Sequence, residues 1–197
     1  KTPSGFGHEF SGIIEEIGSG VKNFKVGDKV IISCVTACGT CMYCKESLYA
    51  HCKDGGWILG HLINGTQAEY VHIPHADNSL YHIPEGISDD AAVMISDILP
   101  TGFEIGVLNG QVKPGDTIAI IGAGPIGMSV LLPSQYYSPG TRMMVASDDN
   151  RLENAKKFGA THTVNSKDGA AAIKKILELT DGVGVNVAIE AVGYPAT

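Results

Sequence analysis

The hydrophobic positions follow one pattern in the first half of the chain and a different pattern in the second. Residues 5–33 hold short apolar runs separated by turn residues, as where Val26-Gly27-Asp28 precedes Lys29–Ile32. Such runs between glycine turns predict short β-strands. Residues 67–73 alternate between apolar and polar side chains and predict a further strand.

A helical segment is predicted over residues 88–109, between the two patterns. Ser88 followed by Asp89 and Asp90 has the features of a helix N-terminus. A serine hydroxyl accepts hydrogen bonds from free backbone N–H groups there, and acidic residues favour the positive end of the helix dipole. Pro100 lacks a backbone N–H, so this segment is expected to bend or split.

The second half alternates short apolar runs, glycine turns and longer helical segments. The predicted strands are residues 118–121, 143–146, 163–164 and 185–190, and the predicted helices are residues 125–137, 151–158 and 170–180. Strands that alternate with helices predict a parallel sheet with crossover helices. Pro133 is expected to kink the first of these helices near its end.

The chain is therefore predicted to combine a β domain with an α/β domain. A length of 197 residues suits one large domain or two small ones, and 44% hydrophobic with 18% charged residues is typical of a globular protein. The change of pattern places the division within residues 98–113. We take 1–105 and 106–197 as the two domains.

Charge and hydropathy exclude several classes of partner. The 21 acidic and 14 basic residues give a net charge of -7, and no basic stripe is available to neutralise nucleic-acid phosphates. The longest apolar stretch, residues 118–132, is too short to span a membrane and contains three glycines. No secretory signal opens the chain, so a cytoplasmic location is expected.

Four of the five cysteines are clustered. Cys38, Cys41, Cys44 and Cys52 form C-x2-C-x2-C-x7-C, a spacing that lets a short loop bring four thiolates to one zinc ion. Such a site is closed and structural, because no position is left for a substrate. Two alternatives are thiols without a metal and a redox pair, the latter disfavoured by the lack of a βαβ context. Cys34 is expected to be a small buried hydrophobic residue.

A glycine-rich loop, Gly122-Ala123-Gly124-Pro125-Ile126-Gly127, lies between a predicted strand and a predicted helix. In this context the first glycine permits a tight turn and the second lets the backbone approach a pyrophosphate. The third lets the helix pack closely on the strand, with its N-terminus facing the anion. The segment therefore predicts a dinucleotide-binding loop.

Together these segments resemble the zinc-dependent medium-chain alcohol dehydrogenases. The cysteine quartet resembles their structural zinc loop, Gly7–Gly12 resembles their G-H-E-x-x-G segment, and Val26–Val30 resembles their G-D-x-V turn. With the glycine loop, the resemblance covers essentially the whole chain. It implies a partial GroES-like β catalytic domain with a zinc lobe, followed by a partial Rossmann parallel-sheet domain.

The resemblance also implies a catalytic zinc, bound in that family by a Cys near the N-terminus, the His of G-H-E and a later Cys or Asp. His8 matches the second ligand and Glu9 the acid beside it, which acts as an alternate ligand or an outer-sphere group. Asp97 matches the third, as in the secondary-alcohol branch, and Trp57 resembles an aromatic residue of the pocket wall. Without the resemblance, His8 would be a surface turn residue, Asp97 a solvent-facing helix residue and Trp57 an ordinary packing residue.

The form of the dinucleotide stays open. An acid that ends the second strand of a Rossmann domain binds the adenosine ribose. Alignment on Ala155–Ala160 places Ala146 at that position. Loss of the carboxylate weakens the case for NAD, but no arginine stands next to it in the sequence. Ser147 could bind a 2′-phosphate, whereas Asp148 and Asp149 would repel it or bind the ribose themselves, and NAD is slightly favoured over NADP.

The function that the resemblance implies is hydride transfer between a small secondary alcohol, or its ketone, and NAD or NADP. The full-length enzyme would be a dimer or tetramer. The first catalytic ligand and part of the nucleotide domain are absent, so these 197 residues alone are expected to be a poor catalyst. Two alternatives are a non-catalytic zinc- and nucleotide-binding remnant, and a polyol or formaldehyde dehydrogenase of the same superfamily.

Overall fold

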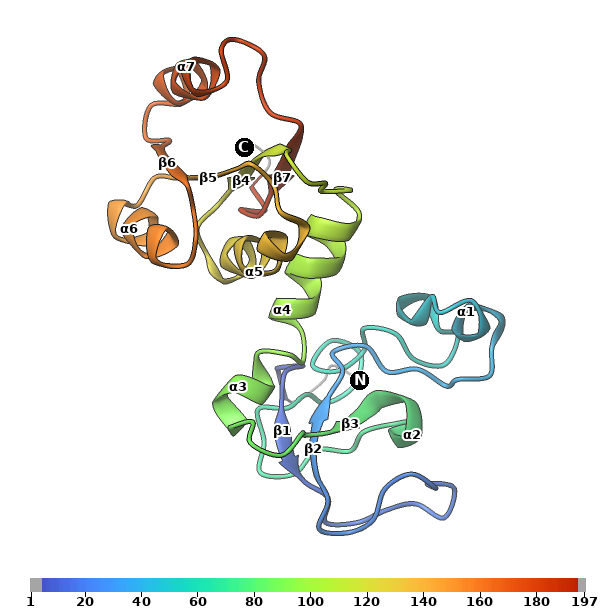
Figure 1. Ribbon diagram of the computed structural model, residues 1–197. Coiled ribbons are helices and arrows are strands. Elements are labelled where there is room, and N and C mark those ends of the chain that lie inside the picture. Colours follow the sequence, from blue (N-terminus) through green and yellow to red (C-terminus); the bar gives the residue numbers. More distant parts are fainter. Residues whose placement is uncertain (1–4, 195–197) are drawn as a thin grey trace. The chain divides into compact units, whose positions relative to one another are not determined.

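The computed structural model describes residues 5–194, which form two compact units that meet in the sequence between Asp97 and Ile98 (Figure 1). Each unit has its own sheet and its own hydrophobic core. The helical segment after Asp97 belongs to the second unit, because Gly102 lies against Ser129 and Gly106 lies against Val130. Neither glycine could carry a side chain without a clash.

The first unit is built on a three-stranded antiparallel sheet in the order β1-β2-β3. The strands are β1 Ser11–Ile13, β2 Lys29–Ile32 and β3 Leu80–His82. Ile31 in the central strand pairs with Ser11 on one side and with Tyr81 on the other. The predicted strand at Lys29–Ile32 is confirmed. The core beneath the sheet contains Phe24, Val30, Ile32, Leu59 and Leu80.

The helices of the first unit are short. They are α1 Met42–Lys45, the 3-10 turn Tyr49–His51, α2 Ala76–Ser79 and α3 Asp89–Val93. Ser88 caps α3 by accepting a hydrogen bond from the backbone N–H of Ala91, as predicted. The split expected in the helical segment 88–109 is confirmed, but it lies between α3, which ends at Val93, and α4 (Ile98–Thr101), which contains Pro100.

The strand predicted over residues 67–73 is wrong. These residues form bends and irregular backbone, and the N–H of Gln67 donates to the carbonyl of Phe6 outside any ladder. Val71 and Ile73 pack against the core of the first unit. Residues 67–70 are exposed, so the alternation in the sequence corresponds to alternate burial only at residues 71–73 and not to a strand paired in a sheet.

The second unit contains a four-stranded parallel sheet in the order β6-β5-β4-β7. The strands are β4 Thr117–Ile121, β5 Thr141–Ala146, β6 His162–Asn165 and β7 Val187–Glu190. Ile120 in the central strand β4 pairs with Met144 of β5 and Ile189 of β7. The parallel arrangement and all four strands confirm the sequence prediction.

Helices cover both faces of this sheet (Figure 1). They are α4 Ile98–Thr101, the π-helix Gly102–Leu108, α5 Pro125–Ser134, the 3-10 turn Gln135–Tyr137, α6 Asp149–Lys157 and α7 Gly169–Leu179. Leu131 of α5 and Leu152 of α6 share one buried cluster with Ile120, while Ala172 of α7 packs with Met143 on the opposite face. Side chains of the strands therefore point alternately into two cores.

The helices also bear on two predictions made from the sequence, the perturbation at Pro133 and the lack of a membrane span. Pro133 lies inside α5, and the helix tightens into a 3-10 turn two residues later, near the end where a perturbation was predicted. Among residues 5–194, no helix is long and apolar enough to cross a lipid bilayer.

Candidate metal and nucleotide sites

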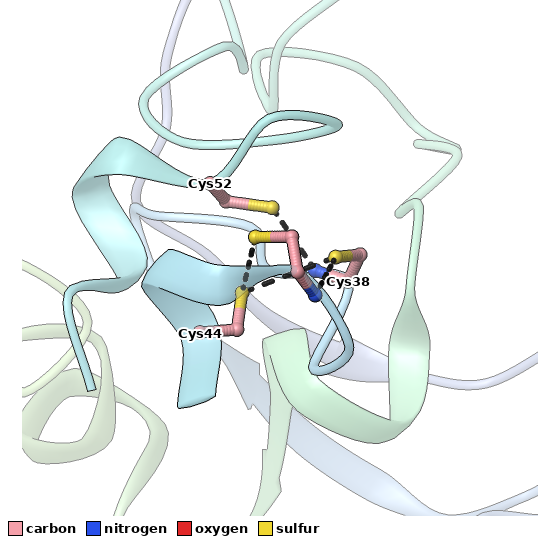
Figure 2. Close-up of side chains that lie close together, drawn as sticks. Cys38, Cys44 and Cys52 are labelled. Carbon is pink, nitrogen blue, oxygen red and sulfur yellow. Dashed lines mark hydrogen bonds between the residues drawn. The ribbon is translucent and has the colours of Figure 1, made fainter. Parts of the chain in front are cut away.

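The four cysteines of the predicted zinc loop converge in space. Figure 2 shows the side chains of Cys38, Cys44 and Cys52 turned toward one another. The Cys44 Sγ lies 3.9 Å from that of Cys38 and 3.5 Å from that of Cys41. All four sulfur atoms lie within 4.8 Å of one another. Zn–S bonds of about 2.3 Å in a tetrahedron place sulfur atoms roughly 3.8 Å apart, so this arrangement fits one zinc ion.

The surroundings of the sulfur atoms differ, and so do their pKa values. Hydrogen bonds from the hydroxyl and N–H of Thr40 and from the N–H of Cys41 lower the pKa of Cys38 to about 5. Cys38 is therefore a thiolate at neutral pH, the form in which a cysteine binds metal. Burial raises the pKa of Cys44 to about 12. A cation at the centre of the quartet would favour its deprotonation.

The loop that carries the quartet has little apolar material of its own. Its buried cluster consists of Ala37, Cys44 and Cys52, with Cys38 and Cys41 packed against it. Thr36 and Gly56 close the base of the loop through two mutual backbone hydrogen bonds of 3.0 and 2.7 Å. With so small a core, bonds from four thiolates to a metal would supply most of the cross-linking within this lobe.

His8 and Asp97 meet in the first unit although 89 positions separate them. The His8 Nε2 lies 2.7 Å from the Asp97 Oδ2, with 29% and 19% of the two side chains exposed. Gly7 has φ +91°, and a Cβ there would lie 2.7 Å from the Oγ1 of Thr66. The same Oγ1 donates to the carbonyl of Glu9 at 2.9 Å. These contacts fix the turn that presents His8.

Trp57 and Cys34 border this pair. The ring of Trp57 meets that of His8 edge-on at a centroid distance of 5.6 Å, stacks on His61 at 4.8 Å and is half exposed. The N–H of Cys34 donates to the carbonyl of Ser96 at 3.1 Å, which sets the thiol beside Asp97. Cys34 lies two residues beyond the end of β2, so its chemical environment depends on which segment lies beside the end of that strand.

The expectation that Cys34 is an ordinary core residue is wrong. The pKa of the Cys34 thiol is raised to about 12. The largest cause is burial, followed by the charge of the Asp97 carboxylate, a hydrogen bond to that carboxylate and the charge of Glu9. A thiol that faces two carboxylates lies in a polar site. Cys34 follows the apolar run of β2 in the sequence, and only the tertiary contacts reveal its polar surroundings.

The glycine loop has the close approaches that a dinucleotide site requires. Gly122 has φ +108°, and a Cβ on Gly127 would lie 1.7 Å from the carbonyl oxygen of Gly122. Around Gly124, which begins α5, the space is open: a Cβ there would meet only the Nη1 of Arg151, at 4.0 Å. Pro125 occupies the first helical turn, and Ala123 and Ile126 complete the loop. The open space at Gly124 fits the approach of a pyrophosphate to the backbone.

The end of β5 lies next to the start of α6. Ala146 ends the strand and is partly buried, and Ser147 is exposed. The carboxylate of Asp148 accepts a hydrogen bond from the N–H of Arg151 at 3.0 Å and caps α6. Asp149 is held by Asn165 and Lys167, and these hydrogen bonds lower its pKa.

Both parts of the chain match known protein families. Residues 1–85 match the alcohol dehydrogenase GroES-like domain, and residues 141–197 match the zinc-binding dehydrogenase family. The chain is 36% identical over 193 residues to zinc-type alcohol dehydrogenase B of Aspergillus flavus, covering 95% of this chain and 45% of that protein. It is 35% identical over 189 residues to the NADP-dependent isopropanol dehydrogenase of Thermoanaerobacter brockii, covering 95% and 53%.

A solved structure is similar along the same length. The zinc dependent alcohol dehydrogenase 2 from Streptococcus pneumonia, in its apo form, superposes with a TM-score of 0.92 at 63% identity, covering 97% of this chain and 54% of that one. The chain belongs to the zinc-dependent medium-chain alcohol dehydrogenase family. It spans about half the length of the curated relatives that it matches.

Membership of the zinc-dependent medium-chain alcohol dehydrogenase family confirms the fold inferred from the resemblance. The GroES-like and Rossmann parts are both present, and the cysteine quartet could bind the zinc of this zinc-type family. In the part of the chain that the structure describes, the quartet is the one group of three or more His, Cys, Asp or Glu donors with all ligand atoms within 4.8 Å. His8 and Asp97 come together in the first unit, and the backbone carbonyl of Glu9 accepts a hydrogen bond from Thr66.

Proposed function

We propose that this chain carries the catalytic metal site and the nucleotide site of an alcohol dehydrogenase. The reaction would transfer a hydride between a small secondary alcohol and NAD(P). The observation that carries this proposal is the 2.7 Å contact between the His8 Nε2 and the Asp97 Oδ2. A nitrogen and an oxygen donor that lie together and are both partly buried suit a zinc ion with mixed ligands.

The residues around this pair have separate tasks in the proposed reaction. Before an ion binds, the hydrogen bond to Asp97 holds the His8 ring, and the Gly7 turn fixes the backbone beneath it. A zinc ion held there would supply Lewis-acid polarisation of the alcohol oxygen. Trp57 would form one wall beside His8 and exclude water from it, and Cys34 would border the site at Asp97.

The second unit would hold the dinucleotide. The open space over Gly124 admits the pyrophosphate, and the N-terminus of α5 faces it. Bound NAD(P) would supply the hydride acceptor. A secondary alcohol is proposed as the substrate because Asp97, rather than a cysteine, is the candidate third ligand, and because one relative is an isopropanol dehydrogenase.

Zinc binding tests the proposal directly. Equilibrium dialysis against zinc, followed by elemental analysis of the 197-residue protein, is expected to give two zinc ions per chain. Asp97→Ala and His8→Ala are each expected to reduce this to one, because each removes a donor from the second site and leaves the cysteine quartet intact. His61→Ala is a matched control, since it removes a histidine that stacks on Trp57 and is not one of the proposed ligands.

Other zinc counts would change the conclusion. One zinc per chain in the unmodified protein and in all three variants would contradict the second site and favour a zinc- and nucleotide-binding remnant. Two zinc ions retained in both Asp97→Ala and His8→Ala would place the second ion elsewhere.

A further inference from the structure

A groove of about 1380 Å³ lies in the first unit beside the edge of its sheet. Residues of β1 and of the irregular segment 69–73 both line it. Its lining also includes partly buried hydrophobic side chains that pack against the core of this unit, namely Phe10, Ile14, Val21, Val71 and Ile73. The groove therefore exposes apolar side chains that the core covers only in part.

β1 has an unpaired backbone edge. It lies at one end of the strand order β1-β2-β3, so only one of its sides pairs with a strand (Figure 1). Phe10 and Ile14 flank β1 and hydrogen-bond to β2 and to the residue before it. Because backbone groups alternate in direction along a strand, the N–H and C=O groups of Ser11 and Ile13 point to the other side. Among residues 5–194, no backbone group pairs with them there.

Residues 69–73 offer a second run of unpaired backbone. In the described part of the chain, their N–H and C=O groups form no hydrogen bond. Tyr70 is 76% exposed, while Val71 and Ile73 pack against the core. Unpaired backbone of this kind is a template for another strand. A strand in the groove would supply the partner that the alternating sequence of residues 67–73 lacks.

The charged side chains around the groove are mainly acidic. Glu15, Glu16 and Glu69 line it, and none of them forms an ion pair among residues 5–194. The ammonium of Lys29, which also lines the groove, is paired with Asp89. A strand with basic side chains is the complementary occupant. A second copy of this chain, with a net charge of -7, would add like charge to the groove.

We infer that this groove binds an extended strand supplied by the part of the family's polypeptide that lies outside these 197 residues, and binds it as a separate molecule. The relatives match 95–97% of this chain and only about half of their own length, so a comparable length of their polypeptide is left to supply the strand.

The groove sets the chemistry of this strand. Its backbone hydrogen-bonds to the outward groups of Ser11 and Ile13 and lies against residues 69–73. Its side chains alternate, because every second one faces the partly covered core. Basic side chains flank the apolar ones and lie near Glu15 and Glu16.

Peptides from a relative test the inference. Overlapping synthetic peptides of roughly ten residues, the upper length of an ordinary strand, tile the part of the Streptococcus enzyme that the match leaves uncovered. Fluorescence anisotropy measures their binding to the full 197-residue chain. We expect binding by a peptide that alternates apolar residues and carries positive charge. Bound, it should slow hydrogen exchange at Ser11, Ile13 and residues 69–73 roughly tenfold, the effect of one net hydrogen bond, and leave β4 and β5 unchanged.

Variants locate the binding site. Ile13→Pro removes an N–H that points away from β2 and should weaken binding roughly tenfold, whereas Ile13→Ala keeps that N–H and should bind more tightly than the proline variant. N-methylation of the bound peptide's own amides should weaken binding to the unmodified chain, which tests the same pairing without any risk to folding. Glu15→Gln combined with Glu16→Gln should weaken binding and reduce its salt dependence. Glu85→Gln is the matched control, since Glu85 is exposed and outside the groove lining.

Several outcomes would overturn the inference. They are binding by none of the peptides, binding that protects amides outside β1 and residues 69–73, and binding that neither Ile13→Pro nor peptide methylation weakens. Self-association of the chain that protects Ser11 and Ile13 would assign the groove to a second copy instead. The zinc counts of the His8 and Asp97 variants do not depend on any of these results.

Discussion

Single glycines set the geometry of the nucleotide loop. At Gly127 the backbone of α5 approaches the carbonyl oxygen of Gly122 so closely that a Cβ would lie 1.7 Å from it. A methyl group cannot be accepted there unless the helix moves away from β4. At Gly169, where α7 begins, a Cβ would meet no atom within 4 Å. The same substitution therefore has opposite consequences at these two positions.

Gly127→Ala is expected to destabilise the second unit by about 2 kcal/mol. Alanine favours a helix by up to about 1 kcal/mol over glycine, but overpacking against fixed backbone costs roughly 1–3 kcal/mol or more, and the clash dominates. Hydrogen exchange of the β4 and α5 amides measures the change.

Gly169→Ala is the control and should be neutral or stabilise by about 0.5 kcal/mol. Equal protection of the amides in the two variants would show that α5 can shift without cost.

At the scale of elements, side-chain caps fix where the crossover helices begin. Asp148 caps α6 by accepting from the N–H of Arg151, and Asp168 caps α7 by accepting from the N–H of Ala171 at 3.1 Å. Each carboxylate satisfies a backbone donor that has no partner within the helix. The cap of α6 also sets the first turn of the helix, where the Arg151 side chain lies near Gly124.

Asp168→Ala is expected to lower the stability of α7 by about 1 kcal/mol, because alanine cannot accept the N-terminal hydrogen bond. Asp168→Asn keeps an acceptor and should remain within a few tenths of a kcal/mol of the original. Hydrogen exchange of the amides in the first two turns of α7 measures both variants. Equal exchange in Asp168→Ala and the unmodified chain would contradict the capping role.

At the scale of the whole molecule, the two units rely on different sources of stability. The second unit buries two layers of aliphatic side chains against a parallel sheet. The zinc lobe of the first unit buries only Ala37, Cys44 and Cys52. Metal binding by such a lobe contributes directly to its folding free energy.

Removal of zinc is therefore expected to weaken the first unit selectively. Trp57 is the single tryptophan of the chain and lies close to the zinc lobe in sequence, so its fluorescence reports that unit. Chelation should shift the urea midpoint seen by Trp57 fluorescence and leave the hydrogen exchange of β4 and β5 unchanged.

Two cysteine variants provide the control. Cys41→Ser should reproduce the effect of the chelator in part, whereas Cys34→Ser should leave zinc binding by the quartet intact. If chelation lowered the stability of the second unit, seen by hydrogen exchange, as much as that of the first unit, seen by Trp57 fluorescence, the two units would not be stabilised separately.

Much of the fold follows from local pattern. The four strands of the second unit, the parallel order, the glycine loop and the Ser88 cap were each predictable, because periodicity, turn residues and caps act within a few residues. The segment 67–73 was not, because alternation indicates one buried side and does not reveal whether a neighbouring strand lies within hydrogen-bonding reach. The split of the helical segment 88–109 was predictable, but its position was not, because Pro100 is accepted in the first turn of α4 and the chain breaks the helix before it.

The sequence by itself determined the zinc-binding loop, the dinucleotide loop and the family, since closely spaced cysteines and glycines carry their chemistry locally. The tertiary structure decided which distant groups meet. The resemblance assigned His8 and Asp97 to one site, and the structure brings their side chains into direct contact across 89 positions and sets the Cys34 thiol beside a carboxylate. It also brought Arg151 to Gly124. Contacts of this kind depend on how strands and helices pack, and no spacing along the chain encodes them.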